Sequence, residues 1–405
     1  MKIAVVGGGS TYTPELVSGV PRLDVDELAL HDIDAERLEI VGGMAKRMLD
    51  RAGFAGELVL TAELDRALAD ADFVVTQIRV GGQAARLHDE TFPLAYGCIG
   101  QETTGAGGLA KALRTVPVVL EIAEQAPEDA WIVDFTIPVG IVTRALLDAG
   151  HRAVGLCNVA ITFQRRFARL LEVQPERVLV NQVGLNHLTW VRSVQLDGGD
   201  VLPELLAEHG EMLAEELELP LRLLEELGAI PSYYLRYFYA HDEVLREQLD
   251  GVPRAQTVAE IEGELLRLYR DPSLVEPPAL LGQRGGAFYS EAAVGLIRSL
   301  SGREPAVHEI DIRNDGTLAG LADDDVVEVP ARVDSDGPVP LPQDSLAPEL
   351  LGLVQHVVAY ERLAARAAVS RDLEDVKKAL LAHPLIGQDE MVEGLMERFA
   401  RVVPT

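Results

Sequence analysis

The sequence predicts an α/β chain that begins with a doubly wound parallel sheet and continues as a mixed α+β region. Three observations carry this prediction. The apolar run 2–6 ends in three glycines, and a helix start follows at Thr13 and Pro14. Strand and helix patterns then alternate to about residue 159, as in a parallel sheet. Beyond residue 177 the pattern changes to antiparallel strands and long helices.

The individual elements follow from these patterns. In the first part we expect a helix near 139–149 and strands at 2–6, up to Asp32, and at 57–61, 72–78, 130–136 and 153–159. In the second part we expect antiparallel strands in RVLVNQVGLNH and TWVRSVQLD, a strand pair at 306–313 and 325–332, a Pro-rich turn PVPLP, and helices at 202–227, 255–270, 286–301, 345–370, 372–382 and 388–400. We therefore divide the chain into a Rossmann-like nucleotide-binding domain, 1–176, and a second domain, 177–405.

Composition excludes several classes of partner. The 405 residues are 48% hydrophobic and carry a net charge of −29, which opposes binding to nucleic acid or to anionic membranes. No run approaches the roughly 18 apolar residues of a membrane helix, and the N-terminus lacks the regions of a secretion signal. The two cysteines, Cys98 and Cys157, fit a reducing cytosol. We expect a cytoplasmic protein that binds a small molecule.

The glycine turn after the first strand indicates a dinucleotide site. A strand, a glycine turn and a helix start aim backbone N–H groups and the helix dipole at a pyrophosphate. An acidic residue about 23 positions later can accept hydrogen bonds from the adenine ribose and would repel a 2′-phosphate, which favours NAD over NADP. The alternative is a glycine-rich turn without a ligand. The predicted NAD-binding residues are Gly7, Gly9, Ser10, Thr11 and Asp32.

Arginines and glycines concentrate in a predicted loop after the fourth strand. The run from Arg79 through Arg86 to Glu90, and the following segment 100–108 with Glu102, would lie at the carboxyl edge of the sheet, where ligands bind. The alternative is a solvated surface turn. Farther along, Arg284 precedes a predicted helix start and could help to bind an anion or a hydroxyl group, or could simply begin the helix.

Two further groups of residues could carry chemistry. Cys157 and His187 each follow an apolar strand, and a thiolate with an imidazole suits a divalent transition metal; a buried cysteine and a hydrogen-bonded histidine are the alternative. A tyrosine cluster surrounds Arg236 and could be aromatic packing or could hold a phenol used as a base. Its members are Tyr233, Tyr234, Tyr237 and Tyr239.

These segments together resemble glycoside hydrolase family 4 along nearly the whole chain. The phrases that carry the resemblance are GGGSTYTPEL, QIRVGG, IGQETTGAGGLAKALRT, GLCNVAI, VGLNHLTWVR, IPSYYLRYFY, RGGAFYSEAA and DDDVVEVPARV. The resemblance implies a glycosidase that depends on NAD and a divalent metal, usually manganese, held by Cys157 and His187. Asn158 is typical of the members specific for β-linked sugars, which implies a 6-phospho-β-glucoside as substrate.

The resemblance also implies a mechanism outside the usual two-carboxylate scheme. NAD takes hydride from C3 of the sugar, a base removes the acidified C2 proton, the aglycone is eliminated, water adds, and the hydride returns. Tyr234 is the implied base, with Tyr233 and Tyr237 as close alternatives. The remaining implied substrate contacts are Arg86 first, then Arg79 and Arg284, for the phosphate, with Glu102, Asn158 and Asn186. Family members are commonly homodimers or homotetramers.

One departure from the family pattern concerns the sugar. Where the family usually reads NFTNP, this chain has Asp134 at the first position and Ile137 at the fourth, and Ile137 can neither donate nor accept a hydrogen bond. Three alternatives therefore stay open: a family 4 glycosidase for an unphosphorylated or α-linked sugar, a catalytically impaired sensor of NAD or sugar phosphate, and an NAD-dependent 2-hydroxy acid dehydrogenase. Lactate and malate dehydrogenases share this kind of nucleotide domain, and we expect the chain to have their overall architecture.

Overall fold

The strands within residues 1–285 and 288–402, which this computed structural model describes, join into one sheet of thirteen strands. The parallel half consists of β1 (Lys2–Val6), β2 (Glu27–His31), β3 (Glu57–Thr61), β4 (Phe73–Thr76), β5 (Trp131–Asp134) and β6 (Ala153–Gly155). Its order is β6-β5-β4-β1-β2-β3, so the winding reverses between β1 and β4. The doubly wound parallel sheet is thereby confirmed, and such a reversal opens a crevice at the carboxyl ends of the strands.

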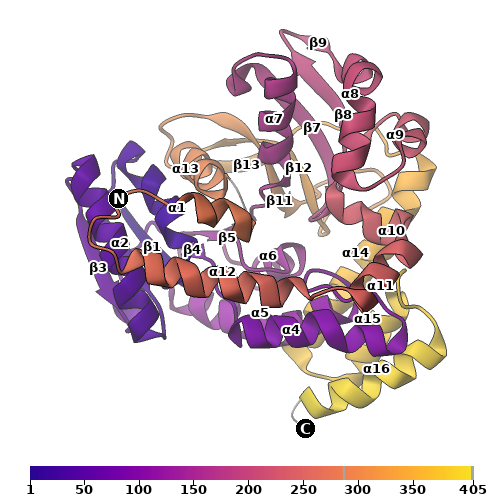
Figure 1. Ribbon diagram of the computed structural model, residues 1–405, viewed down its shortest axis with the longest axis horizontal. Helices are drawn as coiled ribbons and strands as arrows, with labels where there is room; N and C mark the ends of the chain where they lie inside the picture. Colours follow the sequence, from indigo (N-terminus) through magenta and orange to yellow (C-terminus); the bar gives the residue numbers. More distant parts are fainter. Residues whose placement is uncertain (286–287, 403–405) are drawn as a thin grey trace.

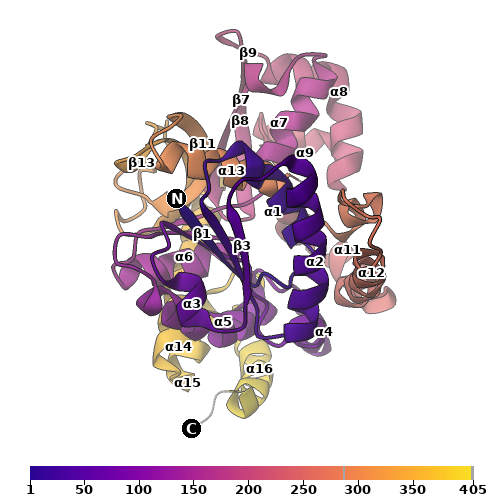
Figure 2. The ribbon, with the colours of Figure 1, turned by 90° about the vertical axis from the view of Figure 1, so that its left-hand side faces the viewer.

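Helices cover both faces of this half. They are α1 (Thr13–Gly19), α2 (Ala35–Ala52), α3 (Leu64–Leu68), α4 (Gly82–Thr91), α5 (Gly105–Gln125) and α6 (Val139–Asp148), whereas α7 (Val159–Leu170) packs against the antiparallel half. Figure 2 shows α1 and α2 on one side of β1 and β3, with α3 and α6 on the other. Local signals fix the ends of α2, because the Asp34 side chain accepts from the Arg37 N–H at 3.0 Å and Gly53 ends the helix in the left-handed region at φ 68°.

The predicted loop after the fourth strand is mostly helical. Gly81 and Gly82 turn the chain at positive φ, and α4 then occupies most of the segment expected to be a loop. The prediction was wrong because the residues after the two glycines include alanine, leucine, glutamine and arginine, all good helix formers. Residues 100–104, directly before α5 begins at Gly105, form neither helix nor strand.

The antiparallel half adds the strands β7 (Val178–Leu185), β8 (Leu188–Leu196), β9 (Gly199–Asp200), β10 (Ile230–Pro231), β11 (Ala306–Arg313), β12 (Val326–Asp334) and β13 (Gly337–Pro340). Its helices are α8 (Leu202–Leu217), α9 (Leu221–Leu227), α10 (Arg236–Tyr239), α11 (His241–Asp250), α12 (Arg254–Tyr269), α13 (Tyr289–Leu300), α14 (Pro348–Ser370), α15 (Leu373–Ala382) and α16 (Asp389–Val402). Figure 1 shows β7, β8 and α8 projecting beyond the parallel half, with α15 and α16 at the opposite end of the molecule.

Three predictions in this half need correction. The helix expected at 202–227 is two helices, because Glu218 takes a left-handed conformation and Pro220 cannot continue the hydrogen-bond ladder. The expected Pro-rich turn begins with β13, which pairs with β12 as an edge strand, where proline is tolerated. The helix expected at 286–301 begins at Tyr289, and residues 286–287 lie outside the described residues.

The two halves of the sheet meet where β6 pairs with β11, and the buried Asp311 lies there beside its cross-strand partner, the buried Glu328. Asp311 of β11 pairs with Gly155 of β6, and Glu328 of β12 pairs with Gly184 of β7. The main hydrophobic core is continuous across this junction and joins residues of β1 and β5 with residues of β12 and α14. A smaller core lies between α7, α8, β7 and β8. Among the described residues, no helix is long and apolar enough to cross a membrane.

The C-terminal helices anchor the first turn of α5. The hydroxyl of the fully buried Tyr360 donates to the Gly105 carbonyl at 2.9 Å, and His383 accepts from the Gly105 N–H at 3.1 Å. Tyr360→Phe leaves that carbonyl without its partner, so we expect the free energy of unfolding to fall by about 1–2 kcal/mol. Urea unfolding measures this difference, and an unchanged midpoint would show that the hydroxyl does not stabilise α5.

Candidate functional site

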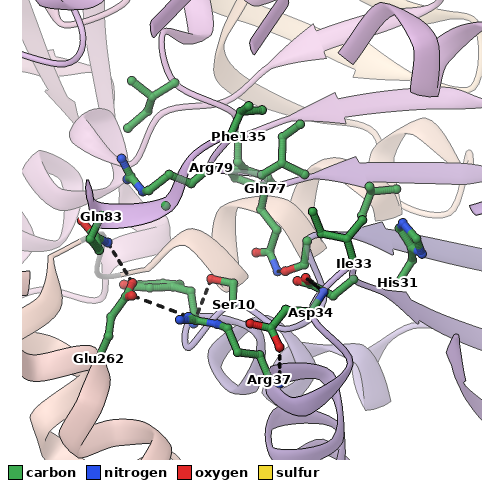
Figure 3. A pocket seen from close by; sticks show the side chains of 18 of the residues that line it. Ser10, His31, Ile33, Asp34, Arg37, Gln77, Arg79, Gln83, Phe135 and Glu262 are labelled. Carbon is green, nitrogen blue, oxygen red and sulfur yellow. Dashed lines mark hydrogen bonds and ion pairs between the residues drawn. The ribbon is translucent and has the colours of Figure 1, made fainter. Parts of the chain in front are cut away.

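A cavity of about 1050 Å³ lies at the carboxyl ends of β1, β2 and β4, at the reversal of the winding. Of the predicted cofactor residues, Gly7, Ser10 and Asp32 line it, whereas Gly9 and Thr11 are buried within the turn. Ile137, which stands where the family usually has asparagine, also lines the cavity. Further lining residues are Gln77, Arg79, Lys111, Phe135, Glu262, Arg284 and Tyr289. Figure 3 shows part of this lining, with Glu262 directed at Gln83 and Arg37.

The glycine turn has a shape that only glycine allows. Gly7 has φ +95°, and a Cβ atom on it would lie 2.7 Å from the Gln77 carbonyl oxygen. Asp32 fastens the turn to the end of β2, because its two carboxylate oxygens accept from the N–H groups of Gly9, at 2.8 Å, and Asp34, at 3.0 Å. Asp32 therefore shapes the turn in addition to lining the cavity.

A cluster of cations surrounds the buried carboxylate of Glu102. Arg79 and Lys111 both form ion pairs with one of its oxygens, and the Arg86 Nε lies 3.0 Å from the other. Burial alone would raise the pKa of Glu102, but these three cations hold it well below its usual range. Burial, with Arg79, lowers the pKa of Lys111 to about 7. Arg86 also pairs with Glu90 at 2.7 Å, so three cations face two carboxylates.

Sequence reasoning missed Lys111. It lies on α5, nine positions after Glu102, within a stretch that otherwise reads as an ordinary apolar helix. A lysine that is only 2% exposed is unusual, but burial is not visible in the sequence.

Arg284 belongs to a different cluster. Its guanidinium donates to Glu262 Oε1 at 3.1 and 2.8 Å and lies over the Tyr12 ring, 5.1 Å from the ring centre. The structure therefore brings Arg79 and Arg86 together on Glu102 and places Arg284 on Glu262, although all three are grouped as phosphate ligands in the prediction.

The buried Cys157 and His187 and the partly buried Tyr234 meet in one cluster. The His187 and Tyr234 rings are stacked, with centroids 3.6 Å apart and planes 9° from parallel. The Cys157 thiol is close enough to Tyr234 to raise the pKa of its phenol, after burial itself. Cys157 follows β6 at the start of α7, and His187 lies in the turn between β7 and β8, so elements distant in sequence supply the three side chains.

The polarity of this cluster suits a cation. Burial lowers the pKa of His187 to about 3, which keeps the imidazole neutral, and its Nδ1 finds no partner among the described residues. Burial, followed by Glu328, raises the pKa of the Cys157 thiol, while the backbone N–H groups of Val159 and Asn158 favour its thiolate. Within the two described ranges, no group of three or more His, Cys, Asp or Glu side chains could hold a metal ion.

Asn186, predicted to contact substrate, is held by the two carboxyl groups at the junction of the sheet. Its amide nitrogen donates to Asp311 and to Glu328, each at 3.1 Å. Both amide hydrogens are thereby used, which leaves its oxygen as an acceptor. Burial raises the pKa of Asp311 to about 7, and burial with Asp311 raises that of Glu328. Sequence reasoning missed both acids, because a charged residue that alternates with apolar ones in a strand is expected on the solvent-facing side.

Asp134, the other departure from the family pattern, has a local structural role. Its Oδ1 accepts from the Thr76 hydroxyl at 2.6 Å and from the Thr136 N–H at 2.9 Å, which joins the carboxyl ends of β4 and β5. Asn158 immediately precedes α7, where its carbonyl accepts from Thr162.

Comparison with known proteins covers nearly the whole chain. Residues 2–173 match the family described as "Family 4 glycosyl hydrolase", and residues 182–386 match its C-terminal domain. The chain is 41% identical to a "Probable 6-phospho-beta-glucosidase" of Bacillus subtilis (strain 168), over 98% of this chain and 95% of that protein. It is 36% identical to the 6-phospho-beta-glucosidase BglT of Thermotoga maritima, over 98% and 97% of the two chains.

Solved structures give the same result. A Thermotoga maritima 6-phospho-beta glucosidase with manganese, NAD+ and glucose-6-phosphate superposes with a TM-score of 0.94 at 36% identity, covering 99% of this chain and 98% of that one. The malate dehydrogenase of Plasmodium falciparum, 14% identical with a TM-score of 0.55 over 91% and 99% of the chains, shares the fold alone. The predicted lactate/malate dehydrogenase-like architecture is confirmed.

Proposed function

The chain belongs to the family 4 glycosyl hydrolases, and on that premise we propose that it hydrolyses 6-phospho-β-glucosides with the help of NAD and a divalent cation, preferably Mn²⁺. The observation that carries this proposal is the cluster of Cys157, His187 and Tyr234, which lies close to the cations around Glu102. The names of the relatives at 36–41% identity support the β-linked, phosphorylated substrate.

NAD fits the cavity at the glycine turn. The positive φ of Gly7 lets a pyrophosphate approach the backbone before α1, and the cavity is large enough for a dinucleotide. Ser10 and Asp32 would hold the phosphate and the ribose. Gly9 and Thr11 would act through the backbone of the turn, because both are buried.

A divalent ion fits the pair Cys157 and His187. The unpartnered Nδ1 shows that the imidazole has unused bonding capacity, and a thiolate with a neutral imidazole is a donor set that transition metals prefer. When bound, NAD supplies an acceptor for hydride and the metal ion supplies charge that polarises a carbonyl on the sugar. A metal bound by two protein ligands leaves room for substrate oxygens.

The residues of the chain then perform the proton chemistry. The Tyr234 oxygen would take the C2 proton as a phenolate, which requires that the bound metal ion and Arg86 offset the effect of burial on the phenol pKa. Its stacking on His187 holds the ring beside the proposed metal ligands. Asn158 would contact the sugar from the start of α7, and Asn186 would accept a hydrogen bond from a hydroxyl through its free amide oxygen. Glu102 would hold the arginine side chains in place.

The 6-phosphate would bind at the cations around Glu102. Arg79 and Arg86 balance the carboxylates Glu90 and Glu102, and Lys111, whose pKa is lowered to about 7, would add positive charge when it is protonated beside a bound anion. Arg284, held by Glu262, would support the phosphate or the cofactor from the other side of the cavity.

One assay tests the proposal. The purified protein is given NAD, Mn²⁺ and a reductant, with 4-nitrophenyl β-glucoside 6-phosphate, its unphosphorylated form and its α anomer as substrates. We expect nitrophenol release from the phosphorylated β-glucoside only when both cofactors are present. Release without NAD, or steady NADH formation from a 2-hydroxy acid with no glycoside cleavage, would refute the proposal.

Binding of NAD is tested at the glycine turn. Gly7→Ala would place a methyl group 2.7 Å from the Gln77 carbonyl in a backbone conformation that alanine rarely adopts. We expect NAD affinity to fall at least about tenfold, with Mn²⁺ affinity retained, since the metal ligands lie on other elements. Calorimetric titration with each ligand measures both. Unchanged NAD affinity would show that the nucleotide does not approach this turn.

Three coarser proposals accompany the function. The division into a nucleotide domain, 1–176, and a domain for substrate binding and oligomerisation, 177–405, agrees with the change from parallel to antiparallel pairing. We propose a homodimer or homotetramer, and a cytoplasmic location in keeping with two unpaired cysteines.

A further inference from the structure

Ser232 connects the segment of the proposed metal ligand to the segment of the proposed base. Its hydroxyl donates to the carbonyl oxygen of His187 at 2.7 Å, and its backbone N–H donates to the carbonyl of Thr189 at 2.9 Å. The side chain is fully buried. Ser232 lies between β10, which pairs with β8, and the short helical turn Tyr233–Leu235 that holds Tyr234.

The hydroxyl is not used in the way that its position in the sequence suggests. A serine directly before a helical turn commonly accepts a hydrogen bond from the backbone N–H groups of that turn. Here the side chain makes no such cap, and it crosses to the hairpin between β7 and β8 instead. The bond therefore contributes to the geometry of the His187 turn and not to the start of its own helix.

The His187 turn needs support of this kind. His187 has φ +65°, a left-handed conformation that residues other than glycine adopt at a cost, and that persists only where the surroundings enforce it. Its ring must at the same time stay parallel to Tyr234, at 3.6 Å. The Ser232 bond holds the carbonyl of the same residue whose ring makes the stack, from a position two residues before Tyr234.

We propose that Ser232 is a positioning residue, which fixes His187 relative to Tyr234. The metal ion and the base would then act on neighbouring atoms of the same sugar. This inference rests on the proposed function. Without the hydroxyl, the left-handed turn loses a constraint, and the imidazole can rotate away from the orientation in which Nδ1 is presented to a metal.

A matched control separates positioning from ordinary stability. Ser299 is 1% exposed, and its hydroxyl donates to the Glu304 carbonyl, also at 2.7 Å, at the end of α13. The Ser299 hydroxyl also lies 2.9 Å from His308 Nε2. Ser299→Ala therefore removes a bond of the same type and length, together with this second contact, in a part of the chain that holds none of the proposed site residues.

The experiment compares Ser232→Ala with Ser299→Ala in the full chain. We expect Ser299→Ala to lose at least as much thermal stability as Ser232→Ala, but only Ser232→Ala should lower kcat, roughly tenfold, with KM for the phosphorylated substrate and NAD affinity within twofold of wild type. Mn²⁺ affinity, followed by electron paramagnetic resonance without substrate, should also fall about tenfold in that variant alone. Ser232→Thr, which keeps the hydroxyl, should recover most of both losses.

Equal kcat and equal Mn²⁺ affinity in the two alanine variants would overturn the inference. If wild type shows no hydrolysis that depends on NAD and Mn²⁺, the proposed function fails, whereas the Mn²⁺ titration still decides the role of Ser232 because it needs no substrate. A threonine variant that folds and binds Mn²⁺ no better than the alanine variant would also count against the hydroxyl.

Discussion

Tyr234→Phe is expected to lower kcat for 4-nitrophenyl β-glucoside 6-phosphate about 10³-fold, because it removes the oxygen that accepts the C2 proton. The ring remains, so its stacking on His187 should persist, and the affinities for Mn²⁺ and NAD should change little. Steady-state kinetics at saturating cofactors measure the loss, and titrations with Mn²⁺ and NAD show whether the site is otherwise intact.

The neighbouring tyrosines provide the control. The Tyr237 hydroxyl lies 2.6 Å from the Gln101 amide and the Tyr233 hydroxyl accepts from Arg236 at 3.0 Å, whereas only Tyr234 stacks on His187. We therefore expect Tyr233→Phe and Tyr237→Phe to keep kcat within about tenfold of wild type, the cost of one hydrogen bond. If Tyr237→Phe lost activity and Tyr234→Phe kept it, the base would be Tyr237.

The parallel half of the fold could be predicted closely because its signals are local. The apolar run before Gly7 predicted β1 and the alternation predicted β2 to β6, each within a few residues. The strand β13 was predicted as a turn because its prolines were considered without β12, the strand with which it pairs. The helix α4 was predicted as a loop because its glycines and arginines were given more weight than the helix propensity of the residues between them. Pro220 was visible in the sequence, but its effect on the helix from 202 to 227 was overlooked.

The site was predictable only in part, for a different reason. Cys157, His187 and Tyr234 could be named through the family resemblance, and the fold brings them together. Lys111, Asp311 and Glu328 could not be identified from the sequence. A charged residue among apolar ones is normally expected on the solvent-facing side of its helix or strand, and only the structure shows that these three are buried. Arg284 is separated from Arg79 and Arg86 because it pairs with Glu262, whereas they pair with Glu102. The spacing of these residues along the sequence does not indicate which carboxylate each arginine binds.

Cys157→Ser is expected to reduce Mn²⁺-dependent hydrolysis by at least about 100-fold, because a hydroxyl is a far weaker metal ligand than a thiolate. The substitution changes one atom in a buried position, so the fold should be kept, and NAD affinity should remain nearly that of wild type because the glycine turn lies on other elements. Titration with Mn²⁺ should show at least the same loss of affinity in the absence of substrate.

Cys98 is the matched control, since it is the other buried cysteine and its thiol lies within hydrogen-bond distance of the Tyr96 carbonyl and the Met391 sulfur, away from the proposed site. Cys98→Ser should keep activity and Mn²⁺ affinity within about twofold, with a small loss of stability from the buried hydroxyl. Equal Mn²⁺ affinity in the two serine variants would mean that the metal does not bind at Cys157. His187 would then have to bind the metal with ligands other than this thiolate, and the stacking of Tyr234 on His187 would no longer place the base beside a thiolate-bound ion.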